Sequence, residues 1–396
     1  MNTAGAMRVI LKPGRERMVR GGHPWIYSGA IASAEGEPPP GAVVEVVGAD
    51  GRPLGRGTWS PSTSIAVRML TRGTRAIDAA FVGERVACAR RLRALVRDTD
   101  ALRLVHGEGD GLPGVVVDRY ADFLVCQLLT AGAEALRPLL VDALMAQVAP
   151  RGIYERSEGR VRTAEGLERR TGVVVGAEPP AEVVITEHGR RYPVDLAAGQ
   201  KTGFFLDQRP GRDLVETLAA DRVVLNLFAY SGAFAVAAAR GGARHVVSVE
   251  SSVAALAQAE TAWRLNELAP DRATWTRADV FAYLRTAPVS ADLVILDPPP
   301  FARRRLDHDR ALAGYKDVNL HALRAAAPEA LVVTFSCSQH VSADEFGQTV
   351  AAAASDAGRP AQVLARLGPG LDHPQALAHA EGRYLKGLLL RLDALA

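Results

Sequence analysis

The fold class is decided by the stretch Val223-Val224-Leu225-Asn226-Leu227-Phe228-Ala229-Tyr230-Ser231-Gly232. Its first five residues are apolar except for Asn226, and this pattern predicts a buried strand. The run Tyr230-Ser231-Gly232 predicts a tight turn, and the apolar residues after it predict a helix. Residues 223–239 carry no charge. Asn226 and the turn nevertheless argue against a membrane span of that length.

Further apolar runs follow at residues 246–249, 273–276, 293–296 and 331–335, separated by segments with helical spacing. Strands that alternate with helices predict a doubly wound α/β sheet. In such a sheet, ligands lie across the carboxyl ends of the strands. The residues that follow each predicted strand are therefore the candidates for function.

The ends of the first three strands favour a nucleoside without phosphate groups. The first turn has one glycine, Gly232, and lacks the G-x-G-x-x-G pattern that a dinucleotide requires. Glu250 ends the second strand, where a Rossmann-like sheet places a carboxylate for ribose hydroxyls, and Asp279 follows the third, within reach of an adenine amine. Each acid has an alternative role as a helix cap or a solvated loop residue. Together they predict S-adenosylmethionine rather than NAD.

The fourth strand is followed by Asp297-Pro298-Pro299-Pro300-Phe301. An Asp-Pro-Pro-aromatic element is typical of nucleic-acid methyltransferases, in which the carboxylate accepts from an exocyclic amine and the ring stacks on a flipped base. Pro300 moves the aromatic residue one place along the chain. The alternative is a rigid loop without a ligand, because proline fixes φ and has no N–H.

The fifth strand ends in Phe335-Ser336-Cys337-Ser338, so we expect Cys337 and Asp297 at the same edge of the sheet. A thiolate that adds to C6 of cytosine makes C5 nucleophilic enough to accept a methyl group. A lone cysteine is more often a small buried hydrophobe, and Cys88 and Cys126 are predicted to be packing residues of that kind. Cys337 lies between serines and is the candidate nucleophile.

Composition bounds the remaining possibilities. The chain has 396 residues, of which 48% are hydrophobic and 23% charged, as in a globular protein of two or three domains. A net charge of +3 does not indicate nucleic-acid binding by itself. The first 72 residues, however, carry nine basic and five acidic side chains, together with short β-like runs at 8–11, 42–47 and 65–70. They predict a small, locally basic barrel.

Three domains are expected, at residues 1–72, 73–183 and 184–396. In the middle one, the pattern predicts helices over 76–96 and 133–148 and strands over 114–118 and 123–128. The scattered cysteines and the nine histidines show no metal-ligand spacing, so no metal is expected. The N-terminus lacks an apolar signal segment, and we expect a cytoplasmic protein without a membrane partner.

From end to end, the chain resembles the PUA-domain-containing class I methyltransferases that make 5-methylcytosine in bacterial 23S ribosomal RNA. The resemblance rests on the turn at Asn226 and on further runs at residues 23–29, 107–114, 154–158, 199–209, 297–299, 314–317, 335–338, 373–374 and 384–387. Several of these runs are specific, among them Gln200-Lys201-Thr202-Gly203-Phe204-Phe205 and Tyr384-Leu385-Lys386-Gly387.

The resemblance implies a fold, a cofactor and a partner. Residues 1–72 would form an RNA-binding PUA barrel, followed by a linking α/β domain and a Rossmann-like class I methyltransferase domain. The substrate would be 23S ribosomal RNA or a large-subunit assembly intermediate, and Cys337 would be the nucleophile. S-adenosylmethionine would be held by Thr202, Phe204, Asn226, Phe228, Tyr230, Ser231, Gly232, Glu250, Ser251, Asp279 and Asp297. The chain departs from other RNA cytosine-C5 methyltransferases in having no cysteine within residues 298–301.

Two alternatives stay open. Methylation of a guanine ring nitrogen or amine in ribosomal RNA needs Asp297 and the prolines but no cysteine, so Cys337 argues for carbon methylation. A non-catalytic RNA-binding assembly factor has no use for Glu250, Asp279 and Asp297 together. A dehydrogenase is disfavoured by the missing glycine pattern.

Overall fold

The computed structural model describes residues 7–286, 290–302 and 305–393. The chain divides into two compact units. The first unit contains the described residues up to Ile185 together with Val194–Phe204 and Leu371–Gly382. The second unit contains Thr186–Pro193, Phe205–Gly370 and the described residues from Arg383 onward. The chain therefore returns to the first unit near its C-terminus before it completes the second.

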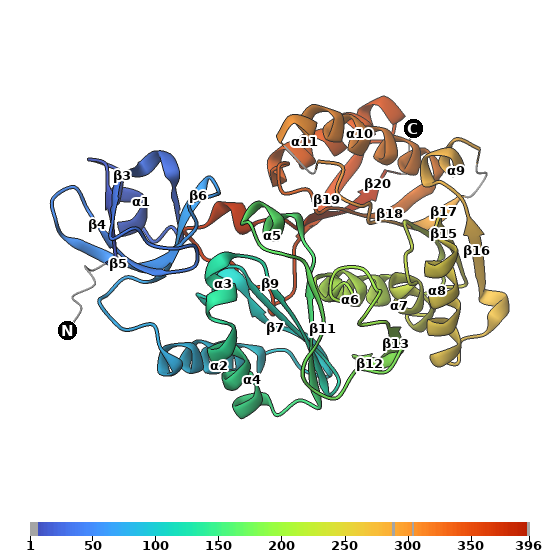
Figure 1. Ribbon diagram of the computed structural model, residues 1–396. Coiled ribbons are helices and arrows are strands. Elements are labelled where there is room, and N and C mark those ends of the chain that lie inside the picture. The colour runs from blue at the N-terminus through green and yellow to red at the C-terminus, as the bar shows by residue number, and fades with distance from the viewer. Residues whose placement is uncertain (1–6, 287–289, 303–304, 394–396) are drawn as a thin grey trace. The chain divides into compact units, whose positions relative to one another are not determined.

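The N-terminal part of the first unit is a six-stranded barrel-like sheet around a small core that includes Val9, Val44 and Val67 (Figure 1). Its order is β2-β6-β5-β4-β1-β3. The strands are β1 (Arg8–Leu11), β2 (Trp25–Tyr27), β3 (Ile31–Glu35), β4 (Val43–Val47), β5 (Pro53–Trp59) and β6 (Ile65–Thr71), with one helix, α1 (Glu16–Arg20). The expected barrel is confirmed, and the Gly48–Gly51 hairpin joins β4 to β5.

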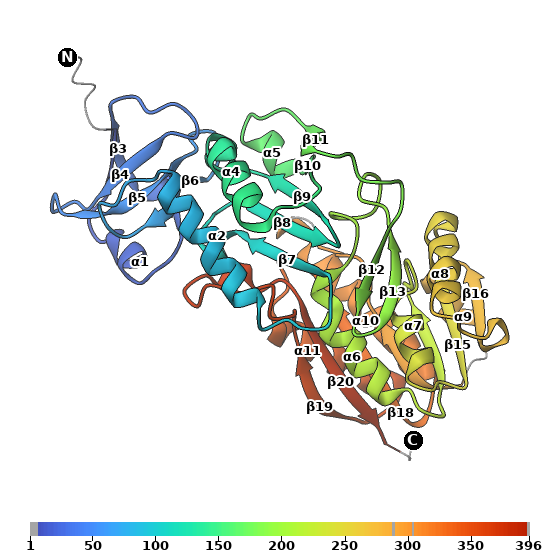
Figure 2. The same ribbon diagram turned by 90° about the horizontal axis from the view of Figure 1, so that it is seen from below.

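A second sheet of five strands, ordered β11-β10-β9-β8-β7, follows in the same unit. It consists of β7 (Ala101–His106), β8 (Val115–Tyr120), β9 (Phe123–Leu128), β10 (Gly152–Ser157) and β11 (Arg170–Gly176), with helices α2 (Ala79–Arg93), α3 (Ala131–Ala135), α4 (Arg137–Val148) and α5 (Arg160–Ala164). Helices α2 and α4 lie side by side against this sheet (Figures 1 and 2). The helix expected over 133–148 is interrupted at Leu136, because Pro138 in the first turn of α4 has no N–H to continue α3.

The second unit is a seven-stranded sheet in the order β16-β15-β14-β17-β18-β20-β19. Its strands are β14 (Val223–Leu227), β15 (His245–Glu250), β16 (Ala273–Arg277), β17 (Ala291–Leu296), β18 (Ala326–Ser336), β19 (Ala361–Leu367) and β20 (Lys386–Leu392). The helices are α6 (Arg209–Leu218), α7 (Ala233–Arg240), α8 (Val253–Leu265), α9 (Val280–Thr286), α10 (His308–Ala325) and α11 (Ala343–Ala357). Strands β14 to β18 are parallel and β20 is antiparallel to β18, so the predicted doubly wound sheet is confirmed.

Helices cover both faces of this sheet because successive strand residues point to opposite faces. Leu293 and Ile295 of β17 pack with α6, α7 and α8, whereas Val294 and Leu296 pack with α9, α10 and α11. Strand order reverses between β14 and β17, and this topological switch point is where ligands bind in such sheets. The turns after these two strands therefore define the candidate site.

A two-stranded hairpin, β12 (Val183–Glu187) and β13 (Arg190–Val194), precedes the second sheet. Glu187 is buried, and Arg212 of α6 donates to both of its carboxylate oxygens at 2.7 and 2.6 Å. Although burial opposes ionisation, Arg212 and the neighbouring Arg209 and Arg190 hold the pKa of Glu187 below its usual value. This buried ion cluster fastens the hairpin to α6.

Candidate active site

The turn after β14 has a strained backbone. Phe228 and Tyr230 have φ values of 58° and 44°, a left-handed region that costs bulky residues about 1–3 kcal/mol each. Gly232 follows with φ 75°, and a Cβ there would lie 2.6 Å from the Cβ of Ala259 in α8. The glycine is therefore required for packing the turn against α8. Such strain persists where the surrounding structure enforces it, as at ligand sites.

Glu250, at the end of β15, is held by this turn. The backbone N–H of Tyr230 donates to one carboxylate oxygen at 3.0 Å. The N–H of Ser252 at 2.9 Å and the hydroxyl of Ser251 at 3.2 Å donate to the other. A carboxylate has about four acceptor positions, so one remains open on the oxygen that faces Tyr230. An oriented, half-buried carboxylate at the switch point fits the hydroxyl groups of a ribose.

Further predicted cofactor residues are engaged within the second unit. Asn226 is buried within β14 and donates from Nδ2 to the hydroxyl of Ser248, its neighbour on β15, at 3.3 Å. Asp279 is exposed, and its Oδ1 accepts from the N–H of Ala282 at 2.9 Å, which caps the first turn of α9. Phe228 packs edge-on against Phe281, with ring centroids 6.3 Å apart. Ser231 is buried in the turn.

Thr202 and Phe204 belong to the first unit. The Thr202 hydroxyl donates to Asp118 at 2.5 Å and lies 2.8 Å from the Tyr120 hydroxyl, and all three side chains are buried. The N–H of Phe204 donates to the same Tyr120 hydroxyl at 3.2 Å. These contacts give both residues a role inside the first unit, and their contact with a cofactor stays a prediction.

Asp297 and Cys337 follow the neighbouring strands β17 and β18, at the same edge of the sheet. Both residues are half-buried, and Sγ of Cys337 donates weakly to the carbonyl oxygen of Pro298 at 3.8 Å. The expectation that the thiol and the Asp-Pro-Pro element lie close together is confirmed.

The loop that carries Asp297 is tied to the loop that carries Cys337. The hydroxyl of Ser338 accepts from the N–H of Ala302 at 3.2 Å and lies 2.8 Å from the hydroxyl of Tyr315 in α10. The ring of Phe301 packs on Tyr315, with centroids 4.7 Å apart. The two loops therefore keep a fixed spacing.

The other cysteines differ from each other. Cys126 is buried in β9, where burial raises the pKa of its thiol to about 12, so its predicted packing role is confirmed. The same prediction for Cys88 is wrong, because Cys88 is exposed on α2. The buried stripe of α2 runs through Phe81, Val82, Val86 and Ala89, and position 88 lies off that stripe.

No role was predicted for Lys386, although this residue lies in the run 384–387 that contributes to the family resemblance. Lys386 begins β20 directly opposite Ser336 of β18, and only 7% of it is exposed. Its ammonium group donates to the carbonyl of Ser338 and, at 3.1 Å, to that of Tyr384. The sequence did contain a signal for this residue, because Lys386 lies just before the apolar run Leu388–Leu390, which predicts a buried strand. A lysine at the start of a buried strand is rare and usually has a partner or a function.

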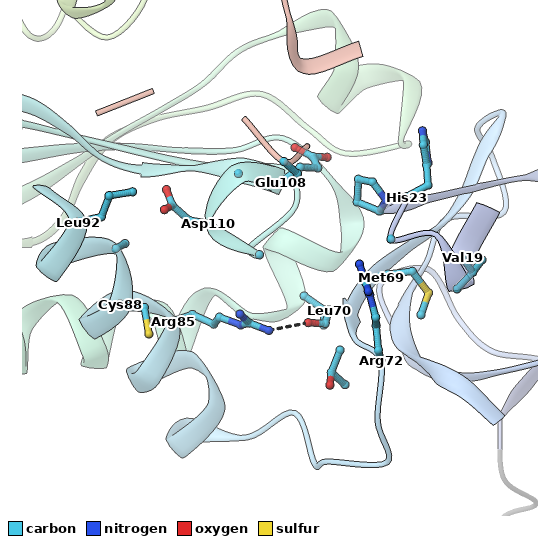
Figure 3. A pocket seen from close by; sticks show the side chains of 17 residues that line it. Val19, His23, Met69, Leu70, Arg72, Arg85, Cys88, Leu92, Glu108 and Asp110 are labelled. Atoms are coloured by element: carbon cyan, nitrogen blue, oxygen red, sulfur yellow. Dashed lines mark hydrogen bonds between the residues drawn. The ribbon is translucent and has the colours of Figure 1, made fainter. Parts of the chain in front are cut away.

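A hollow of about 640 Å³ lies in the first unit (Figure 3). It is lined by β6 residues, α2 and the turn Glu108–Gly111. Arg85 donates to the carbonyl of Leu70 at 3.2 Å. Arg72 makes no hydrogen bond or ion pair with any described residue. Both acids at this hollow are already engaged, Glu108 by Trp25 and Asp110 by Arg93. The guanidinium of Arg72 therefore stays available for an anion.

Comparison with known proteins defines the class. Residues 9–72 match the family described as PUA-like domain. Residues 102–315, more than half of the chain, match the S-adenosylmethionine-dependent methyltransferase family, and the chain belongs to that class. Its cofactor is S-adenosylmethionine. The carboxylates and the strained turn at the switch point fit this group, because its nucleoside end carries hydroxyls and no phosphate.

Close relatives narrow the family. The chain is 43% identical to "Ribosomal RNA large subunit methyltransferase I" of Shewanella amazonensis, over 98% of this chain and 100% of that protein. The protein of the same name from Klebsiella pneumoniae strain 342 is 42% identical, over 97% and 98%. The chain therefore belongs to the family of ribosomal RNA large subunit methyltransferase I.

Solved structures agree on the fold. A methyltransferase designated SMU.776, solved in complex with SAH, matches with a TM-score of 0.86 at 23% identity, over 97% of this chain and all of that one. A SAM-dependent methyltransferase from Streptococcus mutans matches with a TM-score of 0.84 at 22% identity, with the same coverage. Among the described residues, we find no cluster of His, Cys, Asp and Glu that is able to hold a metal ion. None of the described helices is long and apolar enough to cross a bilayer.

Proposed function

We propose that this protein methylates C5 of a cytosine in large-subunit ribosomal RNA, with Cys337 as the nucleophile that adds to C6. The observation that carries the proposal is the pairing of a half-buried thiol with an Asp-Pro-Pro element at adjacent strand ends. The substrate class follows from the names of the relatives, which are ribosomal RNA large subunit methyltransferases.

The proposed reaction uses the chain's own residues as follows. The thiolate of Cys337 adds to C6, forming the S–C6 bond and moving the electron pair of the C5–C6 double bond to C5. When bound, S-adenosylmethionine supplies an electrophilic methyl group on a positively charged sulfur. C5 then takes this methyl group as the methyl–sulfur bond breaks. The C5 proton leaves to solvent, and its electron pair restores the C5–C6 double bond as the S–C6 bond breaks and returns the thiolate. Asp297 accepts from the exocyclic amine of the cytosine and holds the ring in register with Cys337.

For the cofactor, we propose the residues around the switch point. Glu250 takes the ribose hydroxyls, with its carboxylate oriented by Tyr230, Ser251 and Ser252. The strained turn from Phe228 to Gly232 forms the wall beside it, and Asn226, Asp279, Asp297, Thr202 and Phe204 complete the proposed set.

In this proposal, each of the three expected domains has its own role. Residues 1–72 bind RNA through their basic excess, residues 73–183 link, and residues 184–396 carry out methyl transfer. Of the barrel's basic side chains, Arg15, Arg17 and Arg72 lack a hydrogen-bond or ion-pair partner among the described residues and so remain available for phosphates. The proposed substrate places the protein in the cytoplasm, with RNA or an assembly intermediate as its partner.

The test is to identify the methylated atom. Ribosomal RNA that lacks the modification is incubated with the protein and methyl-labelled cofactor, digested to nucleosides and separated with mass-spectrometric detection. We expect label in 5-methylcytidine. Label in a methylated guanosine would replace the proposal with nitrogen methylation. Binding of RNA and cofactor without any transfer would support the assembly-factor alternative.

A further inference from the structure

Lys386 lies beside the proposed nucleophile because of strand pairing. Strand β20 runs antiparallel to β18, and this pairing sets Lys386 opposite Ser336, the residue before Cys337. The ammonium group donates to the carbonyl of Ser338, the residue after Cys337. One side chain from β20 therefore spans the short segment that carries the thiol.

Within the part of the chain that the structure describes, no carboxylate lies at contact distance from the ammonium group of Lys386. Among the described residues, none forms an ion pair with its ammonium group, and its acceptors are two neutral carbonyls. An ammonium group has three N–H donors, so one remains after these two bonds. Burying such a charge is unfavourable unless something compensates for it.

Two ionisable groups face this ammonium, Cys337 and Glu345, and both favour its charged form. Glu345 is already engaged in α11, where it accepts from the N–H of Ser342 at 2.8 Å and lies 2.9 Å from His308. Two further titratable groups lie near the thiol. Burial raises the pKa of Tyr315, so its hydroxyl stays neutral, and the carboxylate of Asp297, at the same sheet edge, acts against ionisation of the thiol. Cys337 is therefore the group whose ionisation Lys386 is best placed to influence.

We infer that Lys386 is the positioning residue that keeps Cys337 as a thiolate near neutral pH. The thiol proton leaves to solvent, and Lys386 keeps its own proton throughout. A fixed positive charge in a partly dry environment stabilises the thiolate before it adds to C6 and again when it leaves. This inference rests on the proposed function for its purpose, although the thiol–ammonium coupling exists with or without cytosine chemistry.

The protonation state of Lys386 is compatible with this role. Burial lowers the pKa of Lys386 to about 8, while Cys337 and Glu345 act in the opposite direction. The side chain is therefore mostly charged at pH 7. An arginine would also carry the charge, whereas a methionine fills similar space without it.

The test measures the thiol directly. In the full-length protein carrying Cys88→Ala, the alkylation rate of Cys337 with iodoacetamide is followed by peptide mass spectrometry from pH 5 to pH 10. The substitution removes the exposed thiol on α2. We expect an apparent pKa for Cys337 below the usual value of about 8.5. Lys386→Met should raise it by at least one unit and slow alkylation at pH 7 by about tenfold, whereas Lys386→Arg should stay near the parent.

Lys316→Met is the matched control, because Lys316 is a partly exposed lysine of α10 that pairs with Asp356 at 2.7 Å. It should leave the thiol pKa unchanged. An unchanged thiol pKa in a folded Lys386→Met variant would overturn the inference. An apparent pKa of Cys337 at or above about 8.5 in the parent protein would also overturn it. That measurement does not depend on whether the Lys386→Met variant folds.

The two proposals fail separately. A depressed thiol pKa that depends on Lys386, in a protein that makes no 5-methylcytidine, would leave the coupling intact and remove the cytosine chemistry. Normal formation of 5-methylcytidine, with a thiol pKa that does not depend on Lys386, would support the cytosine chemistry and remove the role of Lys386.

Discussion

The Sγ atom of Cys337 lies 3.8 Å from the carbonyl oxygen of Pro298. The two residues are 39 positions apart in the chain and meet because β17 and β18 are parallel neighbours with Leu296 paired to Thr334. The thiol and the carboxylate of the preceding Asp297 thus belong to one edge of the sheet. Their proximity is what the proposed methylation of a single cytosine ring requires.

Removing the carboxylate of Asp297 should reduce methyl transfer while leaving the stability of the fold largely unchanged. Asp297→Asn keeps the shape but changes an acceptor into a partial donor, so we expect kcat/KM for methyl transfer to fall by at least about 100-fold. Thermal unfolding should shift little, because the side chain is half-buried at a strand end. Asp292→Asn, at the other end of β17, is the control and should keep activity. Wild-type activity in Asp297→Asn would refute the assigned role.

Substituting Gly232 should destabilise the second unit and weaken cofactor binding together. The new Cβ in Gly232→Ala would meet Ala259 at 2.6 Å and would also require φ 75° of an alanine, so we expect a loss of about 1–3 kcal/mol. Gly347→Ala, in α11 with nothing within 4 Å of the new Cβ, should instead stabilise by about 0.5–1 kcal/mol. Chemical denaturation and calorimetric titration with S-adenosylmethionine check both. A neutral Gly232→Ala would show that the turn relaxes freely.

Neutralising Arg72 should reduce the electrostatic part of RNA binding. Each phosphate contact that is lost lowers the slope of log K against log salt by about 0.7–0.9, and Arg72→Gln should lose roughly one such contact. Arg75→Gln is the matched control, because Arg75 is already paired with Glu84 at 2.6 Å. The slopes of the two variants and the wild-type protein are compared by measuring RNA affinity from about 50 to 300 mM salt. Equal slopes for the two variants would exclude Arg72 from the RNA-binding surface.

The buried ammonium of Lys386 should make stability depend on pH in a defined window. Its pKa is about 8 in the folded protein and about 10.4 in an unfolded chain, so the unfolded state binds more protons between these values. Stability then rises with pH in that window. Relative to Lys386→Met, the wild-type protein should gain unfolding free energy between pH 8 and pH 10. A constant difference between the two proteins would mean that the lysine titrates normally.

The sequence predicted those elements whose pattern is local. The strand over 223–227, the turn to Gly232 and the run 123–128 have the expected bounds, because alternation and turn chemistry act over a few residues. The break between α3 and α4 at Leu136 was not predicted. The residues on both sides of it favour a helix, and the pattern alone does not show that Pro138 begins a new helix. Strand β20, which pairs with β18 from about 50 residues away, was also missed.

For the site, the sequence predicted the shared edge of Asp297 and Cys337 because parallel strands end together. It did not distinguish ligand-binding acids from helix caps, and Asp279 proves to be engaged as a cap. The exposure of Cys88 and the position of Lys386 both depend on which face of an element is buried. That property is decided by tertiary packing, so neither was accessible from residue types alone.

The central claim is that Cys337 forms a covalent bond to cytosine, and mechanism-based trapping tests it most directly. RNA containing 5-fluorocytosine cannot lose a C5 proton after methylation, so the thiol cannot leave and a protein–RNA adduct accumulates. We expect the adduct with the wild-type protein and with Cys88→Ala, and its loss in Cys337→Ser and Cys337→Ala, both of which should still bind S-adenosylmethionine. Methyl transfer at near wild-type rate by Cys337→Ala, with no adduct in the wild-type protein, would contradict the account.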